Sequence, residues 1–139
     1  MSILDRFKLD GKVAIVTGAS SGLGVAFAEG LVLAERSGID RKRAVDVMTQ
    51  SPIGSPMLKA RAELVLDLPD AAWFDISLMQ KDVVLALETA RQLRVPLPSA
   101  ATADQLLTLA RALGYERRDL AALFEVLERL TGDSTRPSA

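Results

Sequence analysis

A glycine-rich stretch near the start of the chain has the residue types and the spacing of a phosphate-binding turn. In VAIVTGASSGLG, residues 13–24, a short apolar run leads into a T-G-x-x-x-G-x-G pattern. A strand, a glycine-rich turn and a helix start place backbone N–H groups against a pyrophosphate at a helix N-terminus. We therefore predict a cofactor-binding turn at Gly18, Ser20, Gly22 and Gly24. The competing interpretation is that these glycines form a loop at a helix start and bind no ligand. It is favoured if the rest of the chain forms no sheet, because the motif binds phosphate only within a strand–turn–helix unit.

Few other groups in the sequence could carry out chemistry. The chain contains no cysteine and no histidine, which excludes disulfides, thiolate nucleophiles, histidine-based triads and nearly every zinc site. Ser20 and Ser21 have no base partner, so nucleophilic catalysis is not supported. The carboxylates of the central linker have the positions of linker and helix-cap residues, namely Asp67, Asp70 and Asp75. We predict no metal site and no paired acid and base.

Length and charge narrow the class of protein. A chain of 139 residues with 49% hydrophobic residues is one domain with a real core. No stretch approaches the roughly 20 apolar residues of a membrane span, and the first residues lack a signal-peptide core. The expected location is therefore the cytoplasm. The net charge is −1, with basic and acidic residues intermixed, so we expect neither nucleic-acid nor membrane binding.

Beyond the glycine-rich stretch the periodicity is helical. Asp40, Ser55 and Asp75 are typical helix N-caps, and Ser55 is followed by a first-turn proline. The sequences SPIGSP at 51–56 and VPLP at 95–98 are helix breakers. The pattern predicts helices over residues 22–37, from 40 to the break at 51, 57–66, from 75 to the break at 95, 99–113 and 119–130. The tail, residues 132–139, is expected to be disordered.

This organisation conflicts with a parallel-sheet fold. After Val13–Val16 the best second strand is AELVLDL at 62–68, which continues a helical register. A lone strand leaves both edges unpaired. Either Val13–Val16 pairs with another copy of the chain, or it is not a strand.

Two family resemblances accompany these patterns. LDGKVAIVTGASSGLG, residues 9–24, resembles the start of a short-chain dehydrogenase/reductase. That family's later motifs are missing, including its Tyr-x-x-x-Lys pair, since Tyr115 is followed four residues on by Asp119. Without that pair no activated phenol is available for acid–base work. A working short-chain dehydrogenase is therefore excluded for this chain alone.

From about residue 28 to 130 the chain is similar to the C-terminal helical domain of the β-hydroxyacid dehydrogenases, the 3-hydroxyisobutyrate dehydrogenase family. The similar segments include AEGLVLAERSGID, SPIGSPMLKARAELVL and WFDISLMQKDVVLALETARQLRVPLP. The resemblance implies a separate Rossmann domain that binds NAD(P), and a helical domain that dimerises and closes the cleft. The family's catalytic lysine would fall near Lys12–Val13, where the sequence follows the other pattern, so we do not assign that role to Lys12. The chain therefore looks like a hybrid, natural or engineered, with segments 1–24, 25–131 and 132–139.

One cleft motif of the helical domain is retained. Its F-x6-K-D spacing falls on Phe74, Lys81 and Asp82, and the resemblance places the lysine near the nicotinamide. An ammonium there would attract an anionic group, and Phe74 would pack against the nicotinamide ring. Alternatively, Lys81 and Asp82 form a solvated pair. Phe74 and Trp73 are expected as core or interface aromatics rather than as ligand contacts.

The architecture that follows is mainly α: a bundle of about six helices like the C-terminal domain of 6-phosphogluconate and 3-hydroxyisobutyrate dehydrogenases, with one short N-terminal strand or extended segment. The helix over 22–37 is apolar nearly all round, which indicates burial by a second subunit and predicts a homodimer. The first functional hypothesis is a dimerising helical domain without catalysis of its own. The second is an NAD(P)-dependent oxidoreductase acting on a small hydroxy acid or aldehyde, with the glycine turn binding cofactor and another chain supplying a domain.

Overall fold

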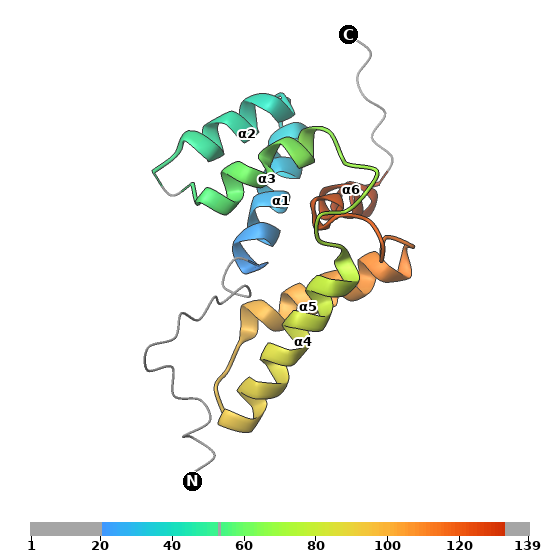
Figure 1. Ribbon diagram of the computed structural model, residues 1–139. Coiled ribbons are helices and arrows are strands. Elements are labelled where there is room, and N and C mark those ends of the chain that lie inside the picture. Colours follow the sequence, from blue (N-terminus) through green and yellow to red (C-terminus); the bar gives the residue numbers. More distant parts are fainter. Residues whose placement is uncertain (1–20, 53, 133–139) are drawn as a thin grey trace.

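In the computed structural model, which describes residues 21–52 and 54–132, the chain is a bundle of helices (Figure 1). The elements are α1 (Ser21–Arg36), α2 (Arg41–Gln50), α3 (Pro56–Leu66), α4 (Ile76–Leu93), α5 (Pro98–Ala112), a 3-10 turn η3 (Leu120–Ala122) and α6 (Leu123–Leu130). The mainly α, six-helix architecture predicted from the sequence is confirmed for this part of the chain. The predicted strand Val13–Val16 and, apart from Gly132, the predicted disordered tail 132–139 lie outside the described residues.

The helix starts follow the predicted caps. The side chains of Asp40, Ser55 and Asp75 each accept a hydrogen bond from the backbone N–H three residues on, at 3.0, 3.0 and 2.7 Å. This contact satisfies one of the free N–H groups of a first helical turn. At the other end of α1, Gly38 adopts φ +83°, which closes the helix with a left-handed residue as its position predicts.

Two further segments test the predicted helix boundaries. Residues 62–66 belong to α3, as their helical register predicts, and Asp67 caps the helix, so the second-strand candidate at 62–68 is not a strand. The predicted helix 119–130 is divided into η3 and α6. Asp119 is the reason: its carboxylate accepts from Ala121 N at 2.9 Å and its carbonyl from Ala122 N at 2.8 Å, which tightens the first turn.

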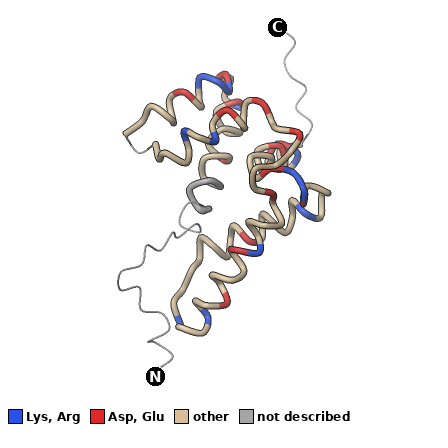
Figure 2. Tube along the Cα trace, viewed as in Figure 1, with Lys and Arg blue, Asp and Glu red and all other residues tan. Residues whose placement is uncertain are grey.

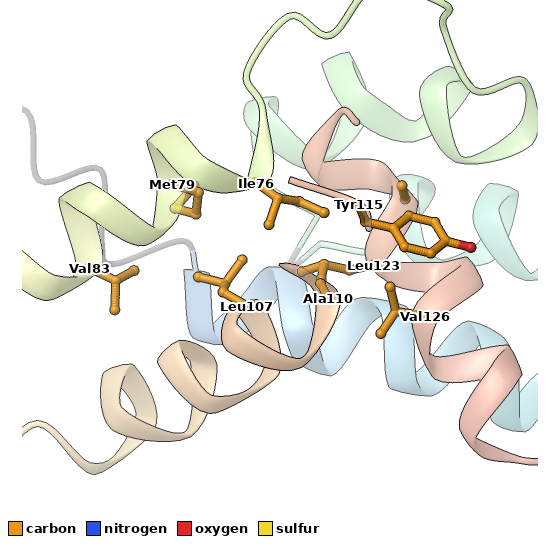
Figure 3. Packing of buried hydrophobic residues seen from close by; sticks show 9 residues of the cluster. Ile76, Met79, Val83, Leu107, Ala110, Tyr115, Leu123 and Val126 are labelled. Carbon is orange, nitrogen blue, oxygen red and sulfur yellow. The ribbon is translucent and has the colours of Figure 1, made fainter. Parts of the chain in front are cut away.

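The helices pack as two pairs joined by a central layer. α4 and α5 form an antiparallel hairpin at one end, α2 and α3 pack together at the other, and α1 and α6 pack between them (Figure 1). The first core cluster lies between α4, α5 and α6 (Figure 3) and contains Ile76, Met79, Val83, Leu107, Ala110, Tyr115, Ala122, Leu123 and Val126. The second lies between α1, α2, α3 and α6 and contains Leu31, Val32, Ala44, Val45, Ala62, Val65 and Phe124. α6 therefore joins the two clusters, since it contributes to both.

α1 is only partly covered by its own chain. Ala28, Leu31 and Val32 are buried, while the Leu33 side chain is 69% exposed. The helix packs on α2, α5 and α6. Burial of its remaining side by a second subunit stays a prediction.

Charged residues of both signs are interspersed along the helices of the described part (Figure 2). No helix among residues 21–52 and 54–132 has the length and apolar character required to cross a membrane. The expected lack of nucleic-acid binding stays a prediction.

Candidate functional site

The first turns of α4 are held rigidly at their inner face. Ile76 is fully buried, and Met79 and Val83 follow it on the side that faces α5 (Figure 3). The spacing of these residues, three and four apart, gives one apolar stripe. The opposite side of the helix is therefore fixed in position and turned toward solvent.

That solvent side carries the predicted Lys81 and Asp82. Leu78 and Leu85 lie three residues before and four residues after Lys81, so the four side chains share one helix face, which we call the α4 outer face. Leu78 is 44% and Leu85 54% exposed. Lys81 Nζ lies 3.2 Å from Asp82 Oδ1, and the lysine side chain is 62% exposed. This contact is the pair that the second interpretation expects, and an ion pair with an exposed lysine is weak. A role of Lys81 in binding an anion stays a prediction.

Phe74 and Trp73 precede α4 and have different surroundings. Phe74 is partly buried and packs against the first core cluster, as expected for a core aromatic. Trp73 is 69% exposed. A core position for Trp73 is therefore wrong, because the segment before Asp75 runs along the surface, and an interface position stays a prediction.

The backbone beneath these aromatics is bound by a residue that the sequence analysis identified only as a helix start. Asp119 Oδ2 accepts hydrogen bonds from the N–H groups of Trp73 and Phe74, at 2.9 and 3.2 Å. Asp119 Oδ1 accepts from Arg61 Nη1 of α3 at 2.9 Å. Asp119 is 1% exposed, so this carboxylate is a buried node that joins α3, η3 and the approach to α4.

Comparison with known proteins identifies the kind of domain that presents this face. The model of a family described as the NAD-binding domain of NADP-dependent 3-hydroxyisobutyrate dehydrogenase matches residues 19–127. The chain belongs to this family. The match includes helices α1 to α5 in full and α6 up to residue 127. It confirms the resemblance of the helical segments, whereas the short-chain-like start and the hybrid origin stay predictions.

Individual relatives of the 3-hydroxyisobutyrate dehydrogenase family agree. The chain is 35% identical to 2-(hydroxymethyl)glutarate dehydrogenase of Eubacterium barkeri over 88% of its own length and 41% of that enzyme. It is 33% identical to L-threonate dehydrogenase of Escherichia coli K12, over 76% of this chain and 35% of the relative. A solved 3-hydroxyisobutyrate dehydrogenase from Salmonella typhimurium superimposes with a TM-score of 0.73 at 32% identity, covering 78% of this chain and 38% of that one. The chain thus spans about two fifths of the length of these relatives.

The glycine motif is only partly within the described residues. Gly18 and Ser20 lie outside them. Gly22 and Gly24 lie in the first turns of α1, which begins at Ser21. A cofactor-binding role for these four residues stays a prediction.

A second polar group, which the sequence analysis did not single out, lies behind α4. The Gln80 side chain donates to Asp104 Oδ1 at 2.9 Å and to Thr108 Oγ1 at 2.7 Å, and accepts from Arg111 Nη1 at 2.7 Å. Gln80 lines a pocket of about 390 Å³ beside α5. Neither Lys81 nor Phe74 lines this pocket. The signal in the sequence was the position of Gln80 on the apolar stripe, four residues after Ile76 and three before Val83.

Proposed function

We propose that this chain is the helical domain of an NAD(P)-dependent β-hydroxyacid dehydrogenase, that it contributes the α4 outer face to a cofactor and substrate cleft, that it dimerises, and that it is not catalytic alone. The observation that carries the proposal is the exposed Lys81 between two exposed leucines, on a helix whose inner face is fully packed. The family match supports NAD(P) as the ligand class.

The chemistry of this face fits a dinucleotide. The Lys81 ammonium would attract a phosphate or a substrate carboxylate, and its departure from Asp82 costs little because that pair is exposed. The leucines and the Phe74 ring offer apolar area to a planar heterocycle. Bound NAD(P) supplies the hydride acceptor or donor of the reaction. Lys81 and Phe74 are proposed to bind and orient.

Acid–base catalysis is proposed to require groups from outside this chain. Tyr115 is 8% exposed, so it lies in the core and not at the α4 outer face. Burial, together with the nearby Glu125 carboxylate, raises the pKa of Tyr115 above its ordinary value of 10.0, which keeps the phenol protonated. The lysine that the family uses has no assigned counterpart here, since Lys12 follows the short-chain pattern.

Exposed apolar side chains support dimerisation. On α1, Leu33 is left uncovered. Beyond the α4 outer face, Val84 in the middle of α4, Leu93 at its end and Val95 just after it are also exposed. Surfaces of this kind commonly mark protein–protein contacts. A second copy of the chain is the proposed partner.

The alternative function places the cofactor at the start of α1. Free N–H groups of a first helical turn bind anions, and Gly22 and Gly24 lie in that region. In this case the chain would bind pyrophosphate through the glycine motif, with a domain supplied by another polypeptide.

One titration separates these proposals. NADH and NADPH are added to the protein while Trp73 emission and energy transfer to the reduced nicotinamide are followed. We expect saturable binding that Lys81→Met weakens by about fivefold, the magnitude of an exposed charge contact. Lys59→Met, which removes an exposed charge from α3, is the matched control. A loss confined to Gly22→Val and Gly24→Val would favour the alternative.

No response up to millimolar cofactor would reject both cofactor roles. Sedimentation of the cofactor-free protein then tests the remaining role: a dimer that Leu33→Glu dissociates supports an assembly domain, and a monomer contradicts it.

A further inference from the structure

We propose that Asp119 is a positioning residue for the cofactor cleft: it fixes the backbone of Trp73 and Phe74, and thereby the place of the Phe74 ring relative to Lys81. This inference rests on the proposed function, since it assumes that Phe74 and the α4 outer face meet the cofactor.

The Asp119 carboxylate uses its full accepting capacity. Oδ1 accepts from Arg61 Nη1 and from Ala121 N, both at 2.9 Å, and Oδ2 accepts from the N–H groups of Trp73 and Phe74. Each oxygen therefore has two donors, which is the usual limit for a carboxylate. Rotation of the side chain would break contacts to three segments at once.

Backbone hydrogen bonds extend the same attachment into α4. Leu120 N donates to Phe74 O at 3.0 Å, Ile76 N to Arg118 O at 3.1 Å, and Ser77 N to Glu116 O at 3.2 Å. Residues 74–77 thus lie along residues 116–120, with an antiparallel bridge between Asp75 and Asp119. Phe74 and the first turn of α4 are held as one unit, and Lys81 lies one further turn along that helix.

A purely structural requirement explains this arrangement less well. Capping η3 needs one acceptor, and serine or asparagine would provide it without burying a charge. Burying a carboxylate is costly, and the ion pair to Arg61 offsets part of that cost. Half of its accepting capacity is directed at the N–H groups of Trp73 and Phe74, in a surface segment where the Trp73 side chain is exposed. From the linker before α4, Leu68 and Phe74 pack against the first core cluster. What the carboxylate secures is the backbone of Trp73 and Phe74 directly before α4, and with it the proposed placement of the Phe74 ring.

The test uses Asp119→Asn, whose amide can still accept from Arg61 and Ala121 but presents an NH2 group to Trp73 and Phe74. Arg61→Gln is the matched control, because it removes the ion pair and leaves both backbone bonds. Two quantities are measured at a temperature where circular dichroism shows full helicity: the fluorescence anisotropy decay of Trp73, the single tryptophan, without cofactor, and the NADPH dissociation constant at several salt concentrations.

For Asp119→Asn we expect faster local motion of Trp73 and about tenfold weaker NADPH binding, with an unchanged salt dependence because Lys81 still provides the ionic contact. Arg61→Gln should leave both quantities within twofold while it lowers the melting temperature. The inference is overturned if Asp119→Asn binds NADPH like the unaltered protein, if Trp73 motion is unchanged, or if Arg61→Gln has equal effects.

A second variant covers the case in which Asp119→Asn does not fold. Asp119→Ser combined with Arg61→Met removes both charges and keeps a hydroxyl to cap η3, and the same results are expected. Absence of NADPH binding by the unaltered protein would overturn the proposed function and the cofactor part of this inference. The Trp73 decay would then still decide whether Asp119 holds the segment.

Discussion

The contact between Arg41 and Phe124 should contribute measurably to the junction of the two core clusters. The Arg41 guanidinium carbon lies 3.9 Å from the centroid of the Phe124 ring. The ring is buried at 1% exposure, and the arginine is 26% exposed. Cation–π contacts range from about 0.5 kcal/mol when exposed to about 2 kcal/mol when desolvated. For this half-buried arginine we expect a coupling energy of about 1 kcal/mol.

A double-mutant cycle of Arg41→Met and Phe124→Leu, followed by urea unfolding, isolates this energy. Phe124→Leu alone should destabilise by about 1–2 kcal/mol, since much of the apolar volume is kept. Arg41→Met also removes the ion pair to Glu35 at 2.7 Å, but this loss occurs in both backgrounds and cancels in the cycle.

Arg129 and Tyr115 provide the control cycle. Their separation is 5.2 Å, and Arg129 is exposed, so Arg129→Met with Tyr115→Leu should show a coupling of no more than about 0.5 kcal/mol. A coupling below about 0.3 kcal/mol for Arg41 and Phe124, the usual error of additivity, would refute the reasoning.

Two further predictions concern pH and backbone conformation. Burial, with a further contribution from Glu35, raises the pKa of Glu128 above its ordinary 4.5 despite Arg41. The folded state then binds the proton more tightly, so stability from this group is lost as pH rises from 4.5 through the raised pKa. Glu128→Gln should remove that slope in melting temperatures measured from pH 4 to 8, and parallel curves would contradict it. Arg94 adopts φ +57° at the end of α4, so Arg94→Gly should stabilise by about 0.5 kcal/mol. Gly114 adopts φ +86°, so Gly114→Ala should destabilise the protein by about 1 kcal/mol in urea unfolding. If Arg94→Gly and Gly114→Ala changed the free energy of unfolding in the same direction, backbone strain at these positions would not explain the effects.

The helices could be predicted because their signals are local. Asp40, Ser55 and Asp75 cap helices through contacts three residues away, and glycine at 38 ends α1 with a left-handed residue. Such contacts depend on residue types that are adjacent in the sequence. The F-x6-K-D spacing places Lys81 and Asp82 on α4, and their role in a cleft stays a prediction.

The buried polar groups could not be predicted, because their partners are distant along the chain. Asp119 is separated by 58 residues from Arg61 and by 46 from Trp73, and Gln80 by 31 from Arg111. From the sequence alone, Asp119 is typical of a helix cap and Gln80 is one polar residue on an apolar stripe. Only the tertiary fold brings each to its partners. The exposure of Trp73 could not be predicted either, because it depends on how the linker before α4 packs on the rest of the chain.

Gln80 and Asp119 are the two buried polar or charged side chains in the part of the chain that the structure describes, and both hold α4. Asp119 fixes its approach, and Gln80 fixes its inner face against α5. The helix so firmly held is also the one that exposes leucines beside Lys81. A rigid face binds a ligand or partner without the entropic cost of ordering it first. Fully bonded buried groups specify one position of a helix, and here that position presents the α4 outer face to solvent. This coincidence favours a face that is preorganised for binding over a scaffold that merely retains the family's residues.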